Sequence, residues 1–399
     1  MLFPTSLSQW TSPPLRWAAL AAIASLVLIT TLLWQWPRDD HNTYGFAGVS
    51  KASGASQAPL YSADVYNTTL GFEKVFAIGL PSRTDKHDAA ALGASMIELD
   101  LNWIDGVKSS DLTPQAFPIG WNKDPNAHQP GMVGSWRAHM NALQTVVSLR
   151  LSTALIIEDD ADYDVSLKVQ LDQFSHGARA IQHQESTTPH SPYGDHWDLL
   201  WLGHHGAIPR ENETNIYIIP EDITAVPVRH NKPWHVPAEK FFQTETSRLV
   251  FPQVRGVATY AYGVTLAGAQ RILARQSMEH MDQNFDEKLG RMCDPEEETM
   301  VLRCIAPFPT IIGAFKRQGP KSWTSDNWFD SKAQGKNDQE WEPARSVGVM
   351  YSVMLNMKRL LLGEKAKAQF DDWPVQESDM NAVRALHGHL MDESELKHT

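Results

Sequence analysis

Residues 154–164 read ALIIEDDADYD, and this stretch decides the fold class. Four apolar residues run directly into a dense acidic group: Glu158, Asp159, Asp160, Asp162 and Asp164. A short continuous apolar run fits a strand that is buried on both faces, as in a parallel sheet. Sheets of this kind bind ligands beyond the carboxyl ends of their strands. The stretch therefore predicts an α/β fold with a binding site where this strand ends.

The acidic group itself has two interpretations. Carboxylates packed this closely repel one another unless solvent or a cation neutralises them. Their hard oxygen atoms suit Mn²⁺ or Mg²⁺ held together with substrate phosphates. The alternative is a solvated acidic turn, but the direct continuation from a buried strand favours a site.

Composition excludes one class of partner. The chain has 399 residues, a length that fits two or three domains or one large α/β domain with appendages. Hydrophobic residues make up 42% of it, which is ample for a sizeable core. The net charge is −12, from 35 basic and 47 acidic residues. Nucleic-acid-binding surfaces need basic stripes, so we expect no nucleic-acid partner.

The N-terminal region predicts a membrane anchor. Residues 15–34 carry one charge, Arg16, and twenty helical residues span about 30 Å, the thickness of a bilayer's hydrocarbon core. A cleaved secretory signal is the alternative, but it normally ends in small residues, whereas this segment ends in LLWQW. We therefore expect a cytosolic tail at 1–14, a transmembrane anchor at 15–36 and a lumenal C-terminal part, in the Golgi or endoplasmic reticulum.

Three further features bear on this location. Residues 37–70 are rich in Ser, Ala, Gly and Asp, which is typical of a stem or linker. Asn67 and Asn212 each begin an N-glycosylation acceptor pattern. Cys293 and Cys304 form no zinc-ligand pattern; in an oxidising compartment they would close a small disulfide loop, and in a reducing one they would remain buried thiols.

A βαβ unit opens the folded part, which we expect from residue 71 onward. Residues 74–80 predict a strand, 84–96 an Ala-rich helix and 97–104 a second strand. Arg83 follows the first strand, where its guanidinium would meet a diphosphate or else pair with Asp85 at the surface.

Histidines occur at two positions where they could have a functional role. A helix predicted over 131–149 has an apolar stripe, and His139 borders that stripe. This position suits a hydrogen-bonded core residue at least as well as a functional one. A buried strand predicted over 197–203 ends at His204 and His205, of which at most one would bind metal or phosphate because sequence neighbours point apart.

The remaining chain completes the α/β pattern. Residues 207–256 are Pro-rich and predict irregular loops, 258–265 a strand, 266–278 a helix and 304–309 a last strand. Asp286 has apolar neighbours that would raise its pKa and suit a general base, although a helix N-cap is an equal alternative. Residues 346–362 predict an amphipathic helix, and the final residues are expected to fray.

Several of these segments resemble, in the same order, the motifs of one enzyme family. Residues 76–85 (FAIGLPSRTD) resemble an opening hydrophobic-I-N-L-x-R-x-x-R segment, and residues 105–106 resemble a DG turn. Residues 131–139 (GMVGSWRAH) resemble a GEIGCxLSH segment, residues 158–160 match an EDD strand end, and residues 262–264 and 285–286 resemble two later motifs, Y-hydrophobic-S and hydrophobic-D. Over about residues 72–330 the chain therefore resembles glycosyltransferase family 25, and the cysteine pair with the predicted C-terminal helix suggests its fungal members. Gly79, Met132 and Ser135 differ from the usual Asn, Glu and Cys.

The resemblance implies a GT-A-like mixed sheet flanked by helices in a catalytic domain over 71–330, followed by a C-terminal extension over 331–399. It implies transfer of a sugar, galactose first, from a UDP-sugar to a hydroxyl of a glycan or glycoprotein. Residue by residue, it implies Mn²⁺ (or Mg²⁺) at Asp160 and Asp162, and Asp286 as the catalytic base. The residues expected at the donor are Arg83, His139, Glu158, Asp159, Asp160 and His204.

Two other functions fit the sequence. The departures at Gly79 and Met132 motivate a non-catalytic, membrane-anchored protein that binds a glycan or a partner with a degenerate transferase fold. A metal-dependent phosphohydrolase also uses clustered Asp residues, but the sequence lacks the further His and Asp ligands of two-metal sites.

Overall fold

The computed structural model describes residues 62–121, 130–185, 189–281, 283–320, 323, 325–327, 341–392 and 394–395. The chain divides into two units, residues 1–56 and 57–399, and all described residues belong to the second. The predicted tail, the predicted anchor at 15–36 and most of the predicted stem lie outside the described residues. No helix within the described ranges is both long and apolar enough to cross a membrane.

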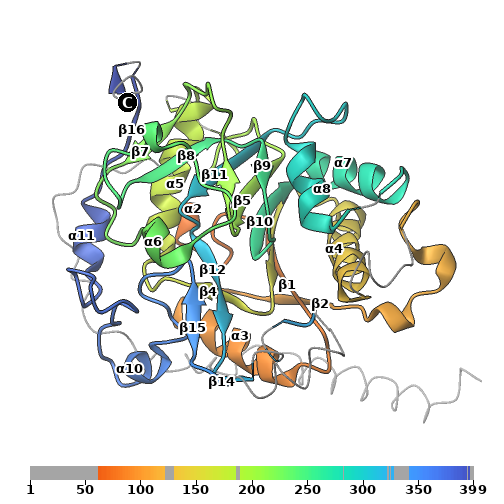
Figure 1. Cartoon of the computed structure of the whole chain (residues 1–399), viewed down its shortest axis with the longest axis horizontal. Helices are drawn as coiled ribbons and strands as arrows, with labels where there is room; N and C mark the ends of the chain where they lie inside the picture. Colours follow the sequence, from red (N-terminus) through yellow and green to blue (C-terminus); the bar gives the residue numbers. More distant parts are fainter. Residues whose placement is uncertain are drawn as a thin grey trace, which may run out of the picture. The chain divides into compact units, whose positions relative to one another are not determined.

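A nine-stranded mixed sheet forms the centre of this unit, in the order β16-β7-β8-β11-β5-β10-β3-β1-β2 (Figure 1). Its strands are β1 (Lys74–Gly79), β2 (Asn102–Asp105), β3 (Thr153–Glu158), β5 (Leu199–Gly203), β7 (Tyr217–Ile219), β8 (Arg248–Pro252), β10 (Ala261–Thr265), β11 (Cys304–Phe308) and β16 (His389–Leu390). Strand β1 runs parallel to both β2 and β3, whereas β10 is antiparallel to β3. The predicted α/β class and βαβ unit are confirmed, and the carboxyl ends of β1, β2 and β3 meet at one edge.

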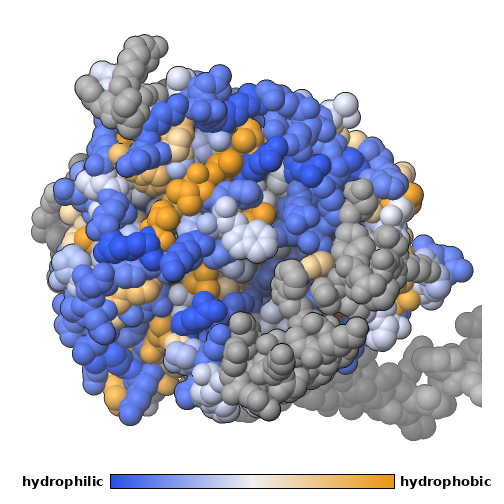
Figure 2. All heavy atoms as spheres, viewed as in Figure 1, coloured by the Kyte–Doolittle hydropathy of each residue, from blue (hydrophilic) through white to orange (hydrophobic). Residues whose placement is uncertain are grey.

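Helices cover both faces of the sheet, because alternate side chains of each strand point to opposite faces. On one face, Ile156 of β3 packs in a core with α4 (Pro130–Leu149), α7 (Leu266–Ser277) and α8 (Phe285–Met292). On the other, Leu155 and Ile157 pack with α3 (Thr84–Met96) and α5 (Leu167–Ile181). Figure 1 shows α4, α7 and α8 together on one side and α5 on the other. The surface seen in Figure 2 is largely hydrophilic, with apolar residues in narrow bands.

A second, three-stranded sheet continues from the acidic stretch. It contains β4 (Ala161–Tyr163), β12 (Ile312–Lys316) and β15 (Arg345–Val347), in the order β15-β12-β4. Strand β4 begins three residues after β3 ends, so the chain passes from one sheet to the other within the acidic stretch. The smaller described elements are α2 (Ser62–Val65), α6 (Val228–Asn231), α10 (Met357–Leu361), α11 (Met380–Arg384), η2 (Ser109–Asp111), η3 (Pro114–Ala116), η4 (Glu239–Phe241), β6 (Ala207–Ile208), β9 (Arg255–Gly256), β13 (Gly319–Pro320) and β14 (Trp341–Glu342).

The boundaries of the folded unit differ from the prediction at both ends. Val65 and Leu70 are fully buried in the core beside α5, so the fold begins before residue 71. At the other end, β16 pairs with β7 and Trp373 is buried, so residues 341–392 are part of the same unit. The fraying expected of about the last thirty residues is wrong for 370–392. A boundary at 330 is therefore wrong as a domain limit.

Two secondary-structure predictions are also wrong. Residues 207–256 are not only loops, because they contribute β7 and β8 to the central sheet; these strands are short and separated by Pro-rich turns, which hid their pattern. The amphipathic helix over 346–362 shortens to α10. Its apolar residues Val349 and Val353 are buried, but Gly348 adopts φ +82° and the following backbone binds side chains of the acidic stretch instead of forming a helix.

Cys293, which follows α8, and Cys304, the first residue of β11, are joined by a disulfide with Cα atoms 5.6 Å apart. The two acceptor asparagines, Asn67 and Asn212, are exposed. The two predicted glycosylation sites therefore lie at the surface of the described unit, where a glycan would have room.

Candidate functional site

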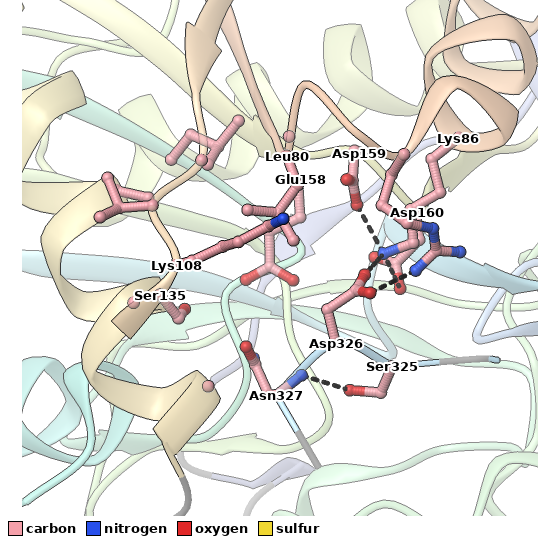
Figure 3. Close-up of a pocket in the computed structure, with 18 of the residues that line it drawn as sticks. Leu80, Lys86, Lys108, Ser135, Glu158, Asp159, Asp160, Ser325, Asp326 and Asn327 are labelled. Carbon is pink, nitrogen blue, oxygen red and sulfur yellow. Dashed lines mark hydrogen bonds and ion pairs between the residues drawn. The ribbon is translucent and has the colours of Figure 1, made fainter. Parts of the chain in front are cut away.

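A cavity of about 850 Å³ lies beyond the carboxyl ends of β1, β2 and β3 (Figure 3). The end of β3 contributes Glu158, Asp159 and Asp160 to its lining, and α4 contributes Ser135 and His139. The segment after β13 closes another side with Trp323, Ser325, Asp326 and Asn327. The acidic stretch therefore faces a cavity at the predicted edge of the sheet.

Two glycines allow the chain to approach itself closely around this cavity. A Cβ atom at Gly79 would lie 2.9 Å from the Cβ of Asp159 and 2.9 Å from the ring of Trp103. A Cβ at Gly134 of α4 would lie 2.2 Å from the carbonyl oxygen of Val107. Gly79, one of the departures from the family motif, is thus required by the packing of Asp159 in this chain.

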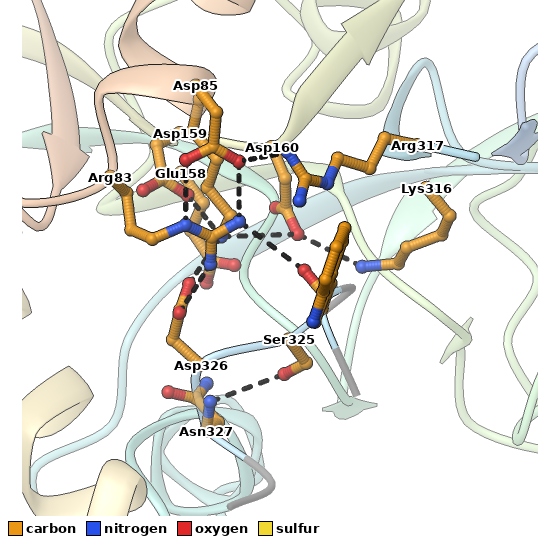
Figure 4. A network of polar contacts seen from close by, with 12 residues as sticks. Arg83, Asp85, Glu158, Asp159, Asp160, Lys316, Arg317, Ser325, Asp326 and Asn327 are labelled. Carbon is orange, nitrogen blue, oxygen red and sulfur yellow. Dashed lines mark hydrogen bonds and ion pairs between the residues drawn. The ribbon is translucent and has the colours of Figure 1, made fainter. Parts of the chain in front are cut away.

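Two lysines, Lys86 (Figure 3) and Lys316 (Figure 4), neutralise the carboxylates. The Nζ atom of Lys86, from α3, lies 2.8 Å from Asp159 Oδ1, 2.8 Å from Asp326 Oδ2 and 4.0 Å from Asp160 Oδ2. The Nζ atom of Lys316, from β12, lies 3.0 Å from Asp160 Oδ2. The repulsion expected within the acidic stretch is therefore relieved by two side chains of the protein itself.

The pKa values of these groups follow from burial and from the lysines. Burial raises the pKa of Asp159 to about 6, and Lys86 only partly opposes this shift. For Asp160, burial also acts upward, but Lys316 and Lys86 outweigh it and leave the pKa below its usual value. Burial acts to lower the pKa of Lys86, yet Asp160, Asp159 and Asp326 outweigh it, so the pKa is raised and the ammonium group stays charged.

Arg83 lines the cavity, as predicted for a residue that contacts a diphosphate, and it also pairs with Asp85, which was the alternative prediction. Its Nε and Nη2 atoms donate to the two oxygens of Asp85 at 2.9 Å each, and its Nη1 atom contacts Asp326. Arg317 reaches the same Asp85 at 2.8 Å and stacks over Trp323 at 4.9 Å. The hydrogen bonds from Arg83 lower the pKa of Asp85 to about 2.

His139 is a core residue that borders the cavity. It is 1% exposed and stacks on the ring of Phe285 at 4.3 Å. Its Nδ1 atom lies 3.2 Å from the hydroxyl of Tyr262, and its Nε2 atom lies 3.4 Å from Glu158 Oε1. The hydroxyl of Thr259 donates to the same Glu158 oxygen at 2.8 Å. His139 and Thr259 therefore fix how Glu158 faces the cavity.

A second cavity, of about 320 Å³, adjoins the first and shares Glu158 and Asp160 with it. Asp286 lines this second cavity, and its Oδ2 atom accepts a hydrogen bond of 2.8 Å from the backbone N–H of Ala258. The N-cap of α8 is Asn284, so Asp286 is not the cap. Burial raises the pKa of Asp286, although the Ala258 hydrogen bond opposes the shift. The side chain of Trp234, 67% exposed, lines the same cavity.

No family model matches this chain. It is 24% identical over 274 residues to inactive glycosyltransferase 25 family member 3 from Homo sapiens, covering 64% of this chain and 39% of that protein. It is 22% identical over 302 residues to procollagen galactosyltransferase 1 from Danio rerio, covering 69% of this chain and 42% of that protein. The chain is similar to members of glycosyltransferase family 25. It spans about two fifths of the length of these relatives, one of which is named inactive.

The cavities bring together most of the donor-site residues expected from this family, namely Arg83, His139, Glu158, Asp159 and Asp160, with Asp286 next to them. Two expected residues lie elsewhere. Asp162, in β4, is fully buried and accepts hydrogen bonds from the backbone N–H of Tyr163 at 2.8 Å and from the hydroxyl of Ser352. It does not line either cavity with Asp160.

His204 is the second residue that lies elsewhere. It is 1% exposed, its Nε2 atom lies 2.7 Å from the carbonyl oxygen of Pro307, and its Nδ1 atom accepts the N–H of Gly206 at 3.1 Å. Both ring nitrogens are therefore used within the protein. Its neighbour His205 lines the second cavity instead, as expected if two adjacent side chains point apart.

The residues present do not fit the expected Mn²⁺ ion. Asp160 is bonded to Lys316, and Asp162, its expected partner as a ligand, faces the C-terminal segment. Asp159 and Asp326 hold the ammonium group of Lys86 between them. Across the described ranges, no group of three or more His, Cys, Asp or Glu side chains could hold a metal ion.

Sequence reasoning missed Lys86, Lys316, Asp326 and Trp234. Lys86 carried a usable signal, because it follows Arg83 by three residues and helical neighbours at that spacing share a face. Lys316 and Asp160 are 156 residues apart in the sequence, so no local pattern links them.

Proposed function

We propose that the chain is a glycosyltransferase that moves a sugar, galactose first, from a UDP-sugar to a hydroxyl of a glycan or glycoprotein. One observation carries this proposal: a cavity large enough for a nucleotide sugar adjoins a second cavity, and both are lined by the carboxylates of Glu158 and Asp160. Transfer between two substrates needs two adjoining sites, and the similarity to family 25 members agrees with this chemistry.

The donor would occupy the larger cavity. Its diphosphate is anionic, and guanidinium and ammonium groups recognise such groups by charge-assisted hydrogen bonds. Arg83, Lys86, Lys108 and Arg317 all line this cavity. Positive charge placed there also stabilises the UDP that leaves, which is where charge develops in the transition state. Because the carboxylates do not fit a metal ion, the proposed transfer does not use one.

The acceptor would occupy the smaller cavity, beside Asp286. The acceptor hydroxyl would lose its proton to the carboxylate of Asp286, and its oxygen would bond to the anomeric carbon of the donor sugar. The bond from that carbon to the phosphate oxygen then breaks, and its electrons remain on UDP. A raised pKa suits a base that must take a proton near neutral pH. The exposed ring of Trp234 offers a flat apolar face on which a sugar acceptor would lie.

The predicted cellular setting remains part of the proposal. A membrane anchor at 15–36 would hold the described unit in the lumen of the Golgi or endoplasmic reticulum, as in a fungal-type member of the family. The Cys293–Cys304 disulfide supports this location, because disulfides persist in oxidising compartments. The exposed Asn67 and Asn212 support it as glycosylation acceptors.

A non-catalytic binding protein is the second candidate, and the relatives named inactive favour it. The transferase candidate predicts that the full chain, in detergent, is thermally stabilised by one member of a panel of UDP-sugars, and a degenerate transferase fold that still binds the donor would show the same stabilisation. Only the first predicts that UDP is released in the presence of a glycan acceptor, and that Asp160→Ala abolishes this release. Binding without release would favour the non-catalytic candidate. The absence of both binding and release would overturn the transferase candidate.

A further inference from the structure

We infer that Lys86 and Lys316 take the place of a divalent cation in this site, so that the nucleotide diphosphate binds without a metal ion. This inference rests on the proposed function, because it concerns how the same cavity holds its donor. It also reverses the expectation drawn from the acidic stretch, which is that clustered carboxylates need a divalent ion.

The position of Lys86 carries the argument. A divalent ion stabilises clustered carboxylates by lying among them, within a few ångströms of each. The Nζ atom of Lys86 already lies among Asp159, Asp326 and Asp160, at 2.8, 2.8 and 4.0 Å. The side chain of Lys86 is 13% exposed, and it projects from helix α3 (Figure 3). A metal ion would have to displace this ammonium group from a largely enclosed position.

Lys316 completes the neutralisation from the opposite side. It projects from β12 in the second sheet, and its Nζ atom lies 3.0 Å from Asp160 on the oxygen that faces Lys86 at 4.0 Å. Asp160 therefore lies between two ammonium groups, which hold its pKa below the usual value against the effect of burial. An ionised carboxylate with two cationic partners gains little from a third cation.

The charges around the cavity balance among the described residues. Five carboxylates line it: Asp85, Glu158, Asp159, Asp160 and Asp326. Five cationic side chains line it or pair with these carboxylates: Arg83, Lys86, Lys108, Lys316 and Arg317. A pocket neutralised in advance does not repel an incoming diphosphate as an acidic one would.

Lys108 supplies the charge that the ligand would use. It follows the DG turn after β2, and Figure 3 shows its side chain extending toward Glu158 across the cavity. Within the described part of the chain, Lys108 has no carboxylate partner, in contrast to Lys86 and Lys316. Lys86 and Lys316 therefore neutralise carboxylates of the protein, whereas the ammonium group of Lys108 is available to the phosphates of the ligand.

Binding of UDP to the full chain in detergent, measured by calorimetry, tests this inference. We expect the dissociation constant to agree within about twofold in EDTA and in Mn²⁺, because the site needs no ion. Binding that appears only with Mn²⁺ would overturn the inference but leave the proposed donor intact. Absence of UDP binding under both conditions would instead overturn the proposed function.

Lys86→Met provides a sharper second arm. Removal of the ammonium group leaves Asp159 without its cationic partner and Asp326 with Arg83 alone. UDP affinity in EDTA is therefore expected to fall about tenfold or more and to recover on addition of Mn²⁺. Electron paramagnetic resonance of Mn²⁺ should report tight binding to this variant and none to the parent. Lys168→Met removes a lysine paired with Glu98 at 3.5 Å, away from both cavities, and should change neither signal. Tight Mn²⁺ binding to the parent, or a variant that stays indifferent to Mn²⁺, would contradict the inference.

Discussion

Replacement of Asp286 by Asn tests the proposed base with little change in shape. The carboxylate of Asp286 accepts the backbone N–H of Ala258 at 2.8 Å, and the amide oxygen of Asn can accept the same hydrogen bond. The hydrogen bond from Ala258 to a neutral amide is weaker than to a carboxylate, but the substitution also removes a negative charge that burial disfavours. We therefore expect the free energy of unfolding to stay within about 1 kcal/mol of the parent.

The expected effect falls on the chemical step. A positioned general base contributes about 10²- to 10⁴-fold to the rate. This range corresponds to about 2.7–5.5 kcal/mol in the activation free energy. Because Asp286 lines the smaller cavity and not the larger one, UDP binding should stay within about twofold of the parent.

The assay is UDP release at saturating donor, with and without acceptor, over a range of pH. The base works only when it is deprotonated, so the parental rate should fall as the pH drops through the raised pKa of Asp286. The Asn variant should lack this acidic limb. Glu287→Gln, at the exposed next residue, removes an equal charge and serves as the matched control. An Asn variant with more than about a third of parental activity, or with the acidic limb intact, would refute the assignment.

Three further predictions concern stability. Arg248→Met should cost about 3–5 kcal/mol in urea unfolding, because it leaves Asp222 buried without the guanidinium that lies 2.6 Å away; a loss below about 1 kcal/mol would contradict this. Burial lowers the pKa of His204 from near 6.5 to about 4, so the unfolded chain takes up this proton first as the pH falls. Stability should therefore be full above pH 6.5 and drop by about 3 kcal/mol toward pH 4, and His204→Gln should remove that part of the pH dependence. Replacement of both Cys293 and Cys304 by Ser should cost about 2.5–3 kcal/mol, as expected for a loop that spans 11 positions, and an unchanged midpoint of thermal unfolding would argue against the disulfide.

The sequence predicted those parts of the fold that depend on local patterns. The apolar run at 154–157 is fully buried, and the helix over 84–96 matches α3 in both bounds. The position of the cavity was predicted for the same reason, because polar residues that follow a buried strand lie at the edge where parallel strands end. A pattern of a few adjacent residues was sufficient to place Glu158, Asp159 and Asp160 in a cavity.

The sequence did not predict what depends on contacts between distant segments. The partners of the acidic stretch, Lys86 and Lys316, lie 73 and 156 residues from the carboxylates that they bind. Strand β7 is only three residues long, and it is held in the sheet by pairing with β8 and β16 on either side. Ion pairs and strand pairings between distant segments leave no periodic pattern in the sequence. The acidic stretch therefore suggested a metal ion, and residues 207–256 suggested loops.

The acidic stretch has two roles because the chain changes sheets within it. Residues 158–160 end β3 and face the cavity, but β4 then turns Asp162 and Asp164 toward the C-terminal segment. Asp162 binds the hydroxyl of Ser352, and Asp164 accepts the backbone N–H of Tyr351 at 2.9 Å. Both carboxylates are at most 1% exposed, and buried carboxylates need hydrogen-bond donors, some of which this segment supplies. Residues 351 and 352 therefore hold in place the strand that follows directly from the cavity, and the segment after residue 330 supports the site rather than extending from it.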